Sequence, residues 1–245
     1  MIIRFLRQEV KRRKAHVVII GISGGVDSAV TVALAVRALG PSRVFGLILP
    51  DSSVTPKSDT EHAVDFAKKL KIKYKIIELS KIKKSLIAGL PKNKNKLAVG
   101  NLLVRLRMIF LYYYASILDG LVVGTGDKSE LSLGYFTKYG DGAVDLLPIA
   151  DVYKTQVRAL ASYLCIPPEI LDKKSSARLW KGHTAEGEIG VNYEDIDKIL
   201  EKLLNNIRVI EPKLVHKSQL VKKLMAKNKH KREMPHICKI KISQR

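Results

Sequence analysis

A short apolar run followed at once by a serine- and glycine-rich turn constrains the fold of this chain more than any other feature. Val17–Ile20 has the composition of a buried strand in a parallel sheet. Gly21–Ser28 (GISGGVDS) comes directly after it, and Ala29–Leu39 then carries apolar residues at helical spacing. A turn in this place presents backbone N–H groups at a helix N-terminus, where they favour an anion. The sequence therefore predicts a phosphate-binding turn between a strand and a helix.

The side chains of this turn suit a bound nucleotide. Two adjacent glycines, Gly24 and Gly25, permit positive φ and allow phosphate oxygens to approach closely. The Ser23 and Ser28 hydroxyls are further donors, and the Asp27 carboxylate would lie beside the phosphates with a Mg²⁺ ion between them. We expect ATP to contact Gly21, Ile22, Ser23, Gly24, Gly25, Val26, Asp27 and Ser28. A tight glycine turn without a ligand is the alternative interpretation.

Strand-like and helix-like segments alternate along the rest of the chain. Further strands are predicted at Val44–Leu49, Tyr74–Leu79 and Leu121–Thr125. Helices are predicted in the amphipathic N-terminal residues 1–16, from a capping box at Ser58–Glu61 to about Leu70, and at Leu97–Leu118, Thr155–Leu164, Tyr193–Asn205 and Pro212–Lys227, with a mobile loop at Pro91–Lys96. The alternation predicts an α/β fold: a doubly wound, mainly parallel sheet flanked by helices.

We expect one domain over residues 1–245, with one large hydrophobic core, because neither a repeat nor a linker divides the chain. Ligands of a doubly wound sheet bind beyond the carboxyl ends of its strands, where the strand order reverses. Ser23, Asp51 and Thr125 each follow a predicted strand. These three side chains are therefore expected to converge.

The formal net charge of +21 is concentrated in two segments. Residues 68–96 and 213–245 each hold 11 Lys and Arg against a single acidic residue, and the rest of the chain is almost neutral. Such segments attract polyanions such as RNA. However, neither one interleaves aromatic residues with its lysines, as single-strand binding modules do. A lysine-coated surface without a nucleic-acid partner is the preferred interpretation.

Nothing in the sequence predicts secretion or a membrane span. No apolar run approaches the roughly 20 residues that a spanning helix needs, and the N-terminus lacks a signal peptide's apolar segment and cleavage site. Cys165 and Cys238 lie far apart and form no CxxC motif, so neither a disulfide framework nor a zinc site is expected. These features favour a reducing, cytoplasmic location.

The turn matches the SGGxDS signature of the PP-loop ATP pyrophosphatases, which cleave ATP between its α- and β-phosphates. Further segments, in order along the chain, resemble the NAD synthetase family: Gly100-Asn101 with Arg105, Arg107 and Met108, then Gly124–Glu130, Phe136–Gly142, Asp145 with Pro148-Ile149, Tyr153–Val157, Ser175–Trp180, and His230–Arg232 with Pro235. This resemblance covers nearly the whole chain.

The resemblance implies a ligase that joins ammonia to deamido-NAD. In that family the nicotinate carboxylate attacks the α-phosphorus of ATP, pyrophosphate leaves, and ammonia displaces AMP from the acyl-adenylate to give NAD. Glutamine-dependent members carry an additional glutaminase domain, which 245 residues leave no room for, so free ammonia is the expected nitrogen donor, with a separate glutaminase partner as the alternative source. The family also implies a homodimer with deamido-NAD bound across the interface, and the apolar helix near Leu102–Ile117 is the expected dimer surface.

The family's functional residues carry over to matching positions of this chain. The resemblance implies that Asp27 and Glu130 bind Mg²⁺, and that Thr125, Lys154 and Ser176 contact ATP, with Asp27 and Lys154 taking part in catalysis. It also implies that deamido-NAD is bound by Arg105, Lys138, Asp145, His230 and Lys231. Taken one by one, each of these residues also has a non-functional interpretation, such as a solvated carboxylate or a surface lysine. Their joint occurrence with the SGGVDS turn favours the site.

The chain departs from the family pattern at several positions. Asp127 stands where Asn is frequent, Ser175 replaces a proline, and Arg178 replaces the usual acidic residue. The family's GQTDE segment is here Gly182–Glu186, GHTAE. These changes spare the expected phosphate and metal ligands but affect residues 175–190, a segment that in the family closes over the substrates.

Two other functions fit the turn. A PP-loop tRNA-modifying enzyme would use the same adenylation chemistry and would explain the basic surface, but thiolation normally needs paired cysteines, which Cys165 and Cys238 do not form. A non-catalytic ATP sensor would need no metal aimed at the α- and β-phosphates, and the presence of both Asp27 and Glu130 argues against it. The synthetase is the preferred hypothesis.

Overall fold

A four-stranded parallel sheet forms the centre of the computed structural model, which describes residues 1–92, 94–207 and 210–240. The strands are β1 (Val17–Gly21), β2 (Val44–Ile48), β3 (Lys73–Ile76) and β4 (Gly120–Val122). They lie in the order β3-β2-β1-β4, and all three pairings are parallel. The strand order therefore reverses between β1 and β4, and this is where such sheets bind ligands.

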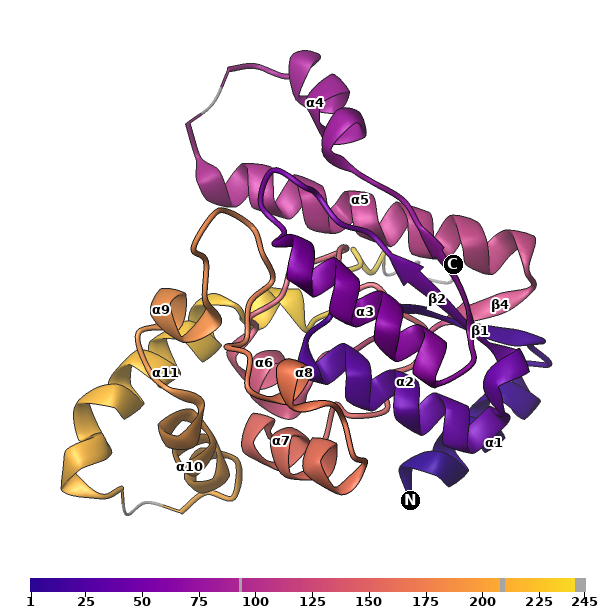
Figure 1. Cartoon of the computed structure of the whole chain (residues 1–245). Coiled ribbons are helices and arrows are strands. Elements are labelled where there is room, and N and C mark those ends of the chain that lie inside the picture. Colours follow the sequence, from indigo (N-terminus) through magenta and orange to yellow (C-terminus); the bar gives the residue numbers. More distant parts are fainter. Residues whose placement is uncertain (93, 208–209, 241–245) are drawn as a thin grey trace, which may run out of the picture.

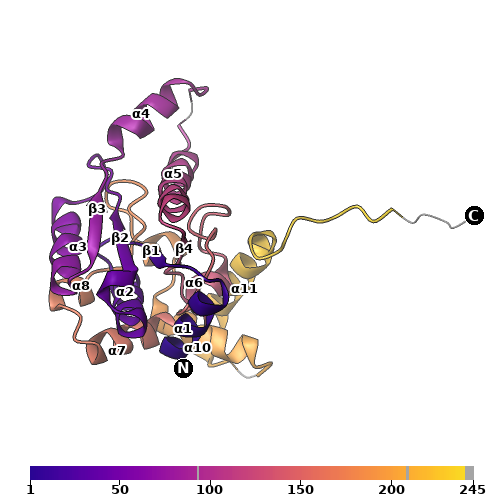
Figure 2. The ribbon, with the colours of Figure 1, turned by 90° about the vertical axis from the view of Figure 1, so that its right-hand side faces the viewer.

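Helices cover both faces of the sheet (Figures 1 and 2). The α-helices are α1 (Ile2–Arg12), α2 (Val26–Leu39), α3 (Lys57–Lys69), α4 (Ser80–Ala88), α5 (Lys96–Ile117), α6 (Lys128–Leu133), α7 (Lys154–Tyr163), α8 (Pro168–Leu171), α9 (Ala185–Ile189), α10 (Tyr193–Leu204) and α11 (Val215–Lys227). Three 3₁₀ turns are η1 (Pro41–Arg43), η2 (Pro212–Leu214) and η3 (Lys229–Lys231). The described chain beyond η3 extends away from the body (Figure 2).

The sheet separates two hydrophobic clusters because alternate residues of a strand point to opposite faces. Val18 and Ile20 of β1 belong to the cluster under α1, α2, α3 and α7. Ile19, between them, belongs to the cluster under α5. All three side chains are fully buried. The apolar run Val18–Ile20 is thus buried on both faces of the sheet.

A third hydrophobic cluster lies outside the sheet. Helices α6, α9, α10 and α11 pack around Tyr193, Ile196 and Leu200, which are all fully buried. The expectation of one large core was therefore wrong for this part of the chain. The helical patterns of the C-terminal half gave no sign that these helices would pack mainly on one another.

The predicted elements occur near their expected positions, and their ends differ. The third strand ends at Ile76 and the fourth at Val122, both earlier than the sequence predicted. The capping box at Ser58–Glu61 was wrong, because α3 begins at Lys57 after Pro56 and makes no side-chain cap hydrogen bond. The short helices α4, α6, α8 and α9 were not predicted. Residue 93 of the predicted loop and residues 241–245 of the second basic segment lie outside the described residues.

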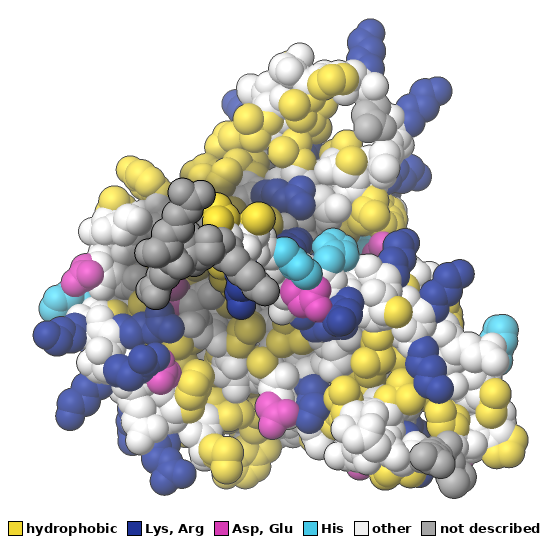
Figure 3. Space-filling view, turned by 180° about the vertical axis from the view of Figure 1, so that it is seen from behind, with side chains coloured by type: hydrophobic (Ala, Val, Ile, Leu, Met, Phe, Trp, Pro, Cys, Tyr) yellow, Lys and Arg dark blue, Asp and Glu magenta, His cyan; other side chains and the backbone are white. Residues whose placement is uncertain are grey.

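By length and composition alone, helix α5 is long and apolar enough to cross a membrane. No segment of this kind was expected from the sequence. In the structure it packs along β1 and β4, and its Leu103 and Leu106 are buried against the sheet. Its opposite side leaves Ile109, Tyr113 and Ile117 more than half exposed. Figure 3 shows hydrophobic side chains gathered over the upper part of the molecule, where α4 and α5 lie in Figure 1.

Candidate active site

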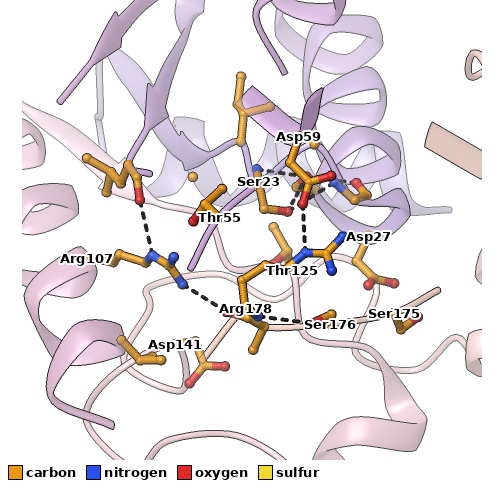
Figure 4. A pocket seen from close by; sticks show the side chains of 18 of the residues that line it. Ser23, Asp27, Thr55, Asp59, Arg107, Thr125, Asp141, Ser175, Ser176 and Arg178 are labelled. Atoms are coloured by element: carbon orange, nitrogen blue, oxygen red, sulfur yellow. Dashed lines mark hydrogen bonds and ion pairs between the residues drawn. The ribbon is translucent and has the colours of Figure 1, made fainter. Parts of the chain in front are cut away.

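A pocket opens at the point where the strand order reverses, beyond the carboxyl ends of β1 and β4. Its lining includes every residue of the turn Gly21–Ser28, as well as Thr125, Glu130 and Ser176. The close-up of the pocket in Figure 4 shows Ser23 and Asp27 of the turn near Thr125, although these residues come from two different strand ends. The fold thus brings together most of the residues that were expected to bind ATP.

The turn itself holds a backbone conformation that requires glycine. Gly24 has φ of 75°, and a Cβ at this position would lie 2.2 Å from the backbone oxygen of Asp59 in α3. The Ser23 and Ser28 hydroxyls hydrogen-bond to each other at 3.1 Å, and Ser28 Oγ also donates to the Gly25 oxygen at 2.9 Å. These bonds fix the turn in the shape that precedes the first turn of α2, which begins at Val26.

Three carboxylates surround one lysine directly beside the turn. Lys154 Nζ lies 2.7 Å from Asp27 Oδ2, 2.9 Å from Asp127 Oδ2 and 3.0 Å from Glu130 Oε1. The Lys154 side chain is fully buried and does not line the pocket, so the structure places it behind the carboxylates. A direct phosphate contact by Lys154, as the family resemblance implied, would need a rearrangement of this cluster.

Burial and the neighbouring charges shift the pKa values of the groups in this cluster. Burial raises the pKa of Asp127 to about 6, and Lys154 opposes that effect. Burial, together with the charges of Asp127 and Asp27, raises the pKa of Glu130 to about 8, again against the effect of Lys154. Burial opposes the charge of Lys154, but the three carboxylates outweigh it and hold the pKa of Lys154 well above its ordinary value. Lys154 therefore stays protonated, and its ammonium group is shared by the three carboxylates.

The residues at the turn fit a Mg²⁺ ion. Asp27 Oδ1 is buried and has no hydrogen-bond partner among the described residues, so one hard oxygen ligand is left unused. Among those residues no group of three His, Cys, Asp or Glu side chains is arranged to hold a metal. Mg²⁺ is usually bound by one or two carboxylates and completed by substrate phosphates and water, so a full protein ligand set is not required.

Lys154 is positioned by buried hydrogen bonds at the start of α7. Its backbone N–H donates to Ser129 Oγ at 2.9 Å, and the next N–H, of Thr155, donates to Asp197 Oδ2 at 2.9 Å. Ser129 Oγ in turn donates to Asp197. These bonds satisfy the first N–H groups of α7, which no intrahelical carbonyl reaches. Helix α10, which carries Asp197, thus fixes the lysine in the site.

Residues 173–178 cross the pocket from the opposite side and are attached to α3. Lys173 Nζ lies 2.8 Å from Asp59 Oδ1, and Arg178 Nε lies 2.7 Å from Asp59 Oδ2. Lys173 Nζ also donates to the Gly24 oxygen at 3.0 Å. Arg107 on α5 donates to the Ala177 oxygen at 3.1 Å (Figure 4). This segment therefore contacts the turn Gly21–Ser28 itself.

Ser176 is held by its own neighbours in this segment. Its Oγ donates to the His183 oxygen at 2.6 Å and accepts from the Arg178 N–H at 3.1 Å. The buried His183 ring lies 2.9 Å from Glu188 Oε2 and 3.1 Å from the Tyr135 hydroxyl. The departure from the family sequence at position 183 thus lies inside a hydrogen-bond network that supports the pocket wall.

The residues expected to bind deamido-NAD do not line this pocket. Arg105 donates to the Lys138 oxygen through Nε at 3.3 Å and Nη2 at 3.2 Å, and Lys138 Nζ donates to the His230 oxygen. Lys231 Nζ donates to two oxygens of the 134–136 segment at 2.8 Å. Asp145 has other contacts, accepting from the Val122 N–H at 2.8 Å. Three of the five residues, Arg105, Lys138 and His230, therefore form one chain of contacts, while Lys231 holds the 134–136 segment and Asp145 binds β4.

The expected convergence of Asp51 was wrong. Asp51 is fully buried, pairs with Lys83 on α4 and does not line the pocket. Position after a strand end fixes where a Cα lies, but this side chain turns toward a lysine that the sequence did not connect with it. Conversely, Asp59, Asp127 and Arg178 were not predicted as site residues. A sequence signal existed for the last two, since both depart from the family pattern.

A parallel α/β sheet with a glycine-rich phosphate turn at its switch point defines the class of adenine-nucleotide α-hydrolase-like folds. The family model described as NAD synthase matches residues 1–235. An ammonia-dependent NAD⁺ synthetase of Archaeoglobus fulgidus is 45% identical over 97% of this chain and 94% of its own length. The chain belongs to the NAD synthase family.

Solved structures agree with this assignment. An NMN synthetase from Francisella tularensis superposes with a TM-score of 0.88 at 33% identity, covering 98% of this chain and 96% of that one. An ammonia-dependent NAD synthetase from Campylobacter jejuni superposes with a TM-score of 0.82 at 34% identity, covering 97% and 96%. The predicted family and fold class are therefore confirmed.

Proposed function

We propose that this chain is an ammonia-dependent NAD synthetase, a ligase that amidates deamido-NAD at the expense of ATP. The reaction joins the nicotinate carboxylate to the α-phosphorus, releases pyrophosphate, and then exchanges AMP for ammonia. The observation that carries the proposal is one pocket, lined by the SGGVDS turn with its Asp27 and by Thr125, Glu130 and Ser176. The ammonia-dependent relatives at 45% identity support the nitrogen donor.

The pocket supplies charge where adenylation needs it. The carboxylate of the substrate and the triphosphate repel each other, so donors and cations must offset charge at the α-phosphorus and on the leaving group. Helix α2 begins at Val26 in the lining of this pocket, and its first N–H groups, which no intrahelical carbonyl reaches, favour an anion there. Mg²⁺ held by Asp27 and Glu130 would neutralise the departing pyrophosphate. Lys154 limits the mutual repulsion of the carboxylates that hold the metal.

The chain of contacts from Arg105 through Lys138 to His230, together with the neighbouring Lys231, supports a separate deamido-NAD subsite. Arg105, Lys138 and Lys231 carry positive charges, which suit the phosphates and carboxylate of this substrate. We propose that the chain, as one domain, forms a homodimer through the exposed face of α5, so that a partner completes this subsite. The exposed side chains of Ile109, Tyr113 and Ile117 support this surface.

The basic segments do not argue for another substrate. Lys and Arg side chains are scattered over the face in Figure 3 and are not gathered in one groove. We therefore do not include nucleic acid among the partners of the proposed enzyme, and a tRNA-modifying activity is not favoured. A cytoplasmic location agrees with a substrate set of ATP, deamido-NAD and ammonia.

The decisive assay supplies the purified chain with ATP, MgCl₂, ammonium chloride and deamido-NAD. We expect NAD, AMP and pyrophosphate in equal amounts. Release of ADP, or turnover that requires tRNA, would contradict the proposal. Asp65→Asn, on the exposed side of α3, is a suitable control for the active-site variants described below.

A second substrate is tested in the same assay. The superposition with an NMN synthetase makes nicotinate mononucleotide, the acid form of NMN, the alternative acceptor. The ratio of kcat/KM for the two acids decides between them. We expect deamido-NAD to be preferred, because the curated relatives at 42–50% identity carry the NAD synthetase name. A preference for the mononucleotide would leave the proposed adenylation and amidation unchanged and would replace deamido-NAD as the proposed substrate.

A further inference from the structure

Arg178 lies in the pocket without a role in the reaction described so far. It lines the same cavity as Ser23, Gly24 and Asp27, and in Figure 4 its side chain extends across that cavity to Asp59. Its position beside a phosphate-binding turn raises the question of what it binds when nucleotide is present.

Asp59 holds two cations with one carboxylate. Its Oδ1 pairs with Lys173 at 2.8 Å and its Oδ2 pairs with Arg178 at 2.7 Å. The Asp59 side chain is almost fully buried, whereas about a quarter of the Arg178 side chain is exposed. The three side chains therefore leave one positive charge in excess at the pocket wall. This charge is anchored to the turn, because Lys173 Nζ also donates to the Gly24 oxygen.

The guanidinium of Arg178 has donors to spare. Among the described residues, Nε is its only side-chain nitrogen with a hydrogen bond. A guanidinium carries five N–H groups in a planar fork that matches two phosphate oxygens. The backbone of the segment is fixed independently, by Arg107 at the Ala177 oxygen and by Ser176 at the Arg178 N–H. The side chain can therefore change partner while the backbone stays in place.

We propose that Arg178 binds the β- and γ-phosphates of ATP, and the pyrophosphate formed from them, by exchanging Asp59 for phosphate oxygens. In the absence of nucleotide, Asp59 stands in for the phosphate and keeps the arginine at the pocket. With nucleotide bound, Lys173 still neutralises Asp59, so no buried charge is left unpaired. This inference rests on the proposed function for the identity of the anion.

The alternative is a purely structural clasp between α3 and residues 173–178. The two interpretations differ in the effect of removing Asp59. If Asp59 competes with phosphate for Arg178, Asp59→Asn strengthens pyrophosphate binding. If Asp59 only holds the segment in place, Asp59→Asn and Arg178→Gln both weaken it. The sign of the Asp59 effect therefore separates the two.

The experiment is a calorimetric titration of the full chain with pyrophosphate in the presence of MgCl₂. We expect Arg178→Gln to weaken binding about 10- to 100-fold, the loss of one charge-assisted bidentate contact. Arg178→Lys keeps the charge but loses the fork, and should fall between wild type and Arg178→Gln. Asp59→Asn should tighten binding about 3- to 5-fold, and only while Arg178 is present.

Lys181→Gln is the matched control, because it removes one cation from an exposed neighbour that does not line the pocket. It should leave pyrophosphate binding within about twofold of wild type. Weaker binding in Asp59→Asn, no loss in Arg178→Gln, or no pyrophosphate binding by the wild-type chain would overturn the inference. The titration needs no deamido-NAD, so it can succeed while the NAD assay fails, and the reverse.

Discussion

Lys154 Nζ lies 2.7 Å from Asp27 Oδ2, so the first turn of α2 and the first residue of α7 meet at the edge of the phosphate-binding turn. The two residues are 127 positions apart in the chain. Asp127 and Glu130 from the strand β4 side complete the group. One ammonium group thus pairs with three carboxylates, an arrangement that favours binding of a further cation.

Asp127→Asn should stabilise the protein at neutral pH. Burial raises the pKa of Asp127 to about 6 from an ordinary value of about 4, so the folded state binds this proton more tightly than the unfolded state. Wild type therefore loses stability as pH rises from about 4 to about 6, by roughly 2–3 kcal/mol. The variant lacks this loss, and Asn still caps α6.

Urea unfolding of both proteins at pH 4 and pH 7 checks this prediction. The stability difference should grow in favour of the variant as the pH rises. The exposed Asp119→Asn is a control in which the difference should stay small. A constant difference between the two pH values would show that Asp127 does not carry the shifted proton.

Lys154→Met should cost about 3–5 kcal/mol of stability, because it leaves buried carboxylates without their cation. The loss should be smaller by more than about 1 kcal/mol in an Asp127→Asn background, since one of those charges is then already absent. A double-mutant cycle by chemical denaturation measures the coupling. Lys128→Met, which breaks a pair with the exposed Asp151, should cost less than about 1 kcal/mol. Equal losses in both backgrounds would refute the coupling.

Gly24→Ala should destabilise the protein by about 3 kcal/mol and abolish ATP binding. The new Cβ would meet the Asp59 oxygen at 2.2 Å, and the backbone φ of 75° is unfavourable for alanine. Gly182→Ala is the matched control: its φ is 77°, but a Cβ there meets nothing within 4 Å. It should cost only about 1 kcal/mol. Thermal unfolding of both variants separates the cost of the contact with α3 from the cost of the backbone conformation.

Asp27→Asn should reduce turnover roughly 100-fold or more while leaving the fold intact. The variant keeps one neutral amide oxygen but loses the carboxylate charge that would bind Mg²⁺ and that faces Lys154. The dependence of NAD formation on MgCl₂ concentration is the measurement, with circular dichroism to verify folding. Near-wild-type turnover at the same MgCl₂ concentration would refute the metal assignment.

Ile109→Glu should convert the proposed dimer into monomers, because it places a charge at the centre of the exposed face of α5. Sedimentation velocity at micromolar concentration checks this result. Tyr163→Glu on α7 alters an even more exposed side chain elsewhere and should leave the dimer intact. A wild-type chain that sediments as a monomer would remove the dimer from the proposal.

The sequence by itself determined the parallel α/β fold, the glycine-rich turn after β1 and the family. Apolar runs such as Val17–Ile20 show their burial directly, and a glycine turn such as Gly21–Ser28 has few other uses after a strand. These signals are local, so they need no knowledge of distant neighbours. The short helices and the exact strand ends escaped because they depend on packing more than on propensity.

Only the tertiary structure decided the partners of the charged side chains. Asp51 follows a strand as Ser23 does, yet it pairs with Lys83 and does not line the pocket, while Asp59 in the first turn of α3 does. Lys154 is surrounded by carboxylates instead of facing solvent. Ion pairs form between residues that the fold brings within a few ångströms, and their energy depends on burial, so no pattern along the chain encodes them.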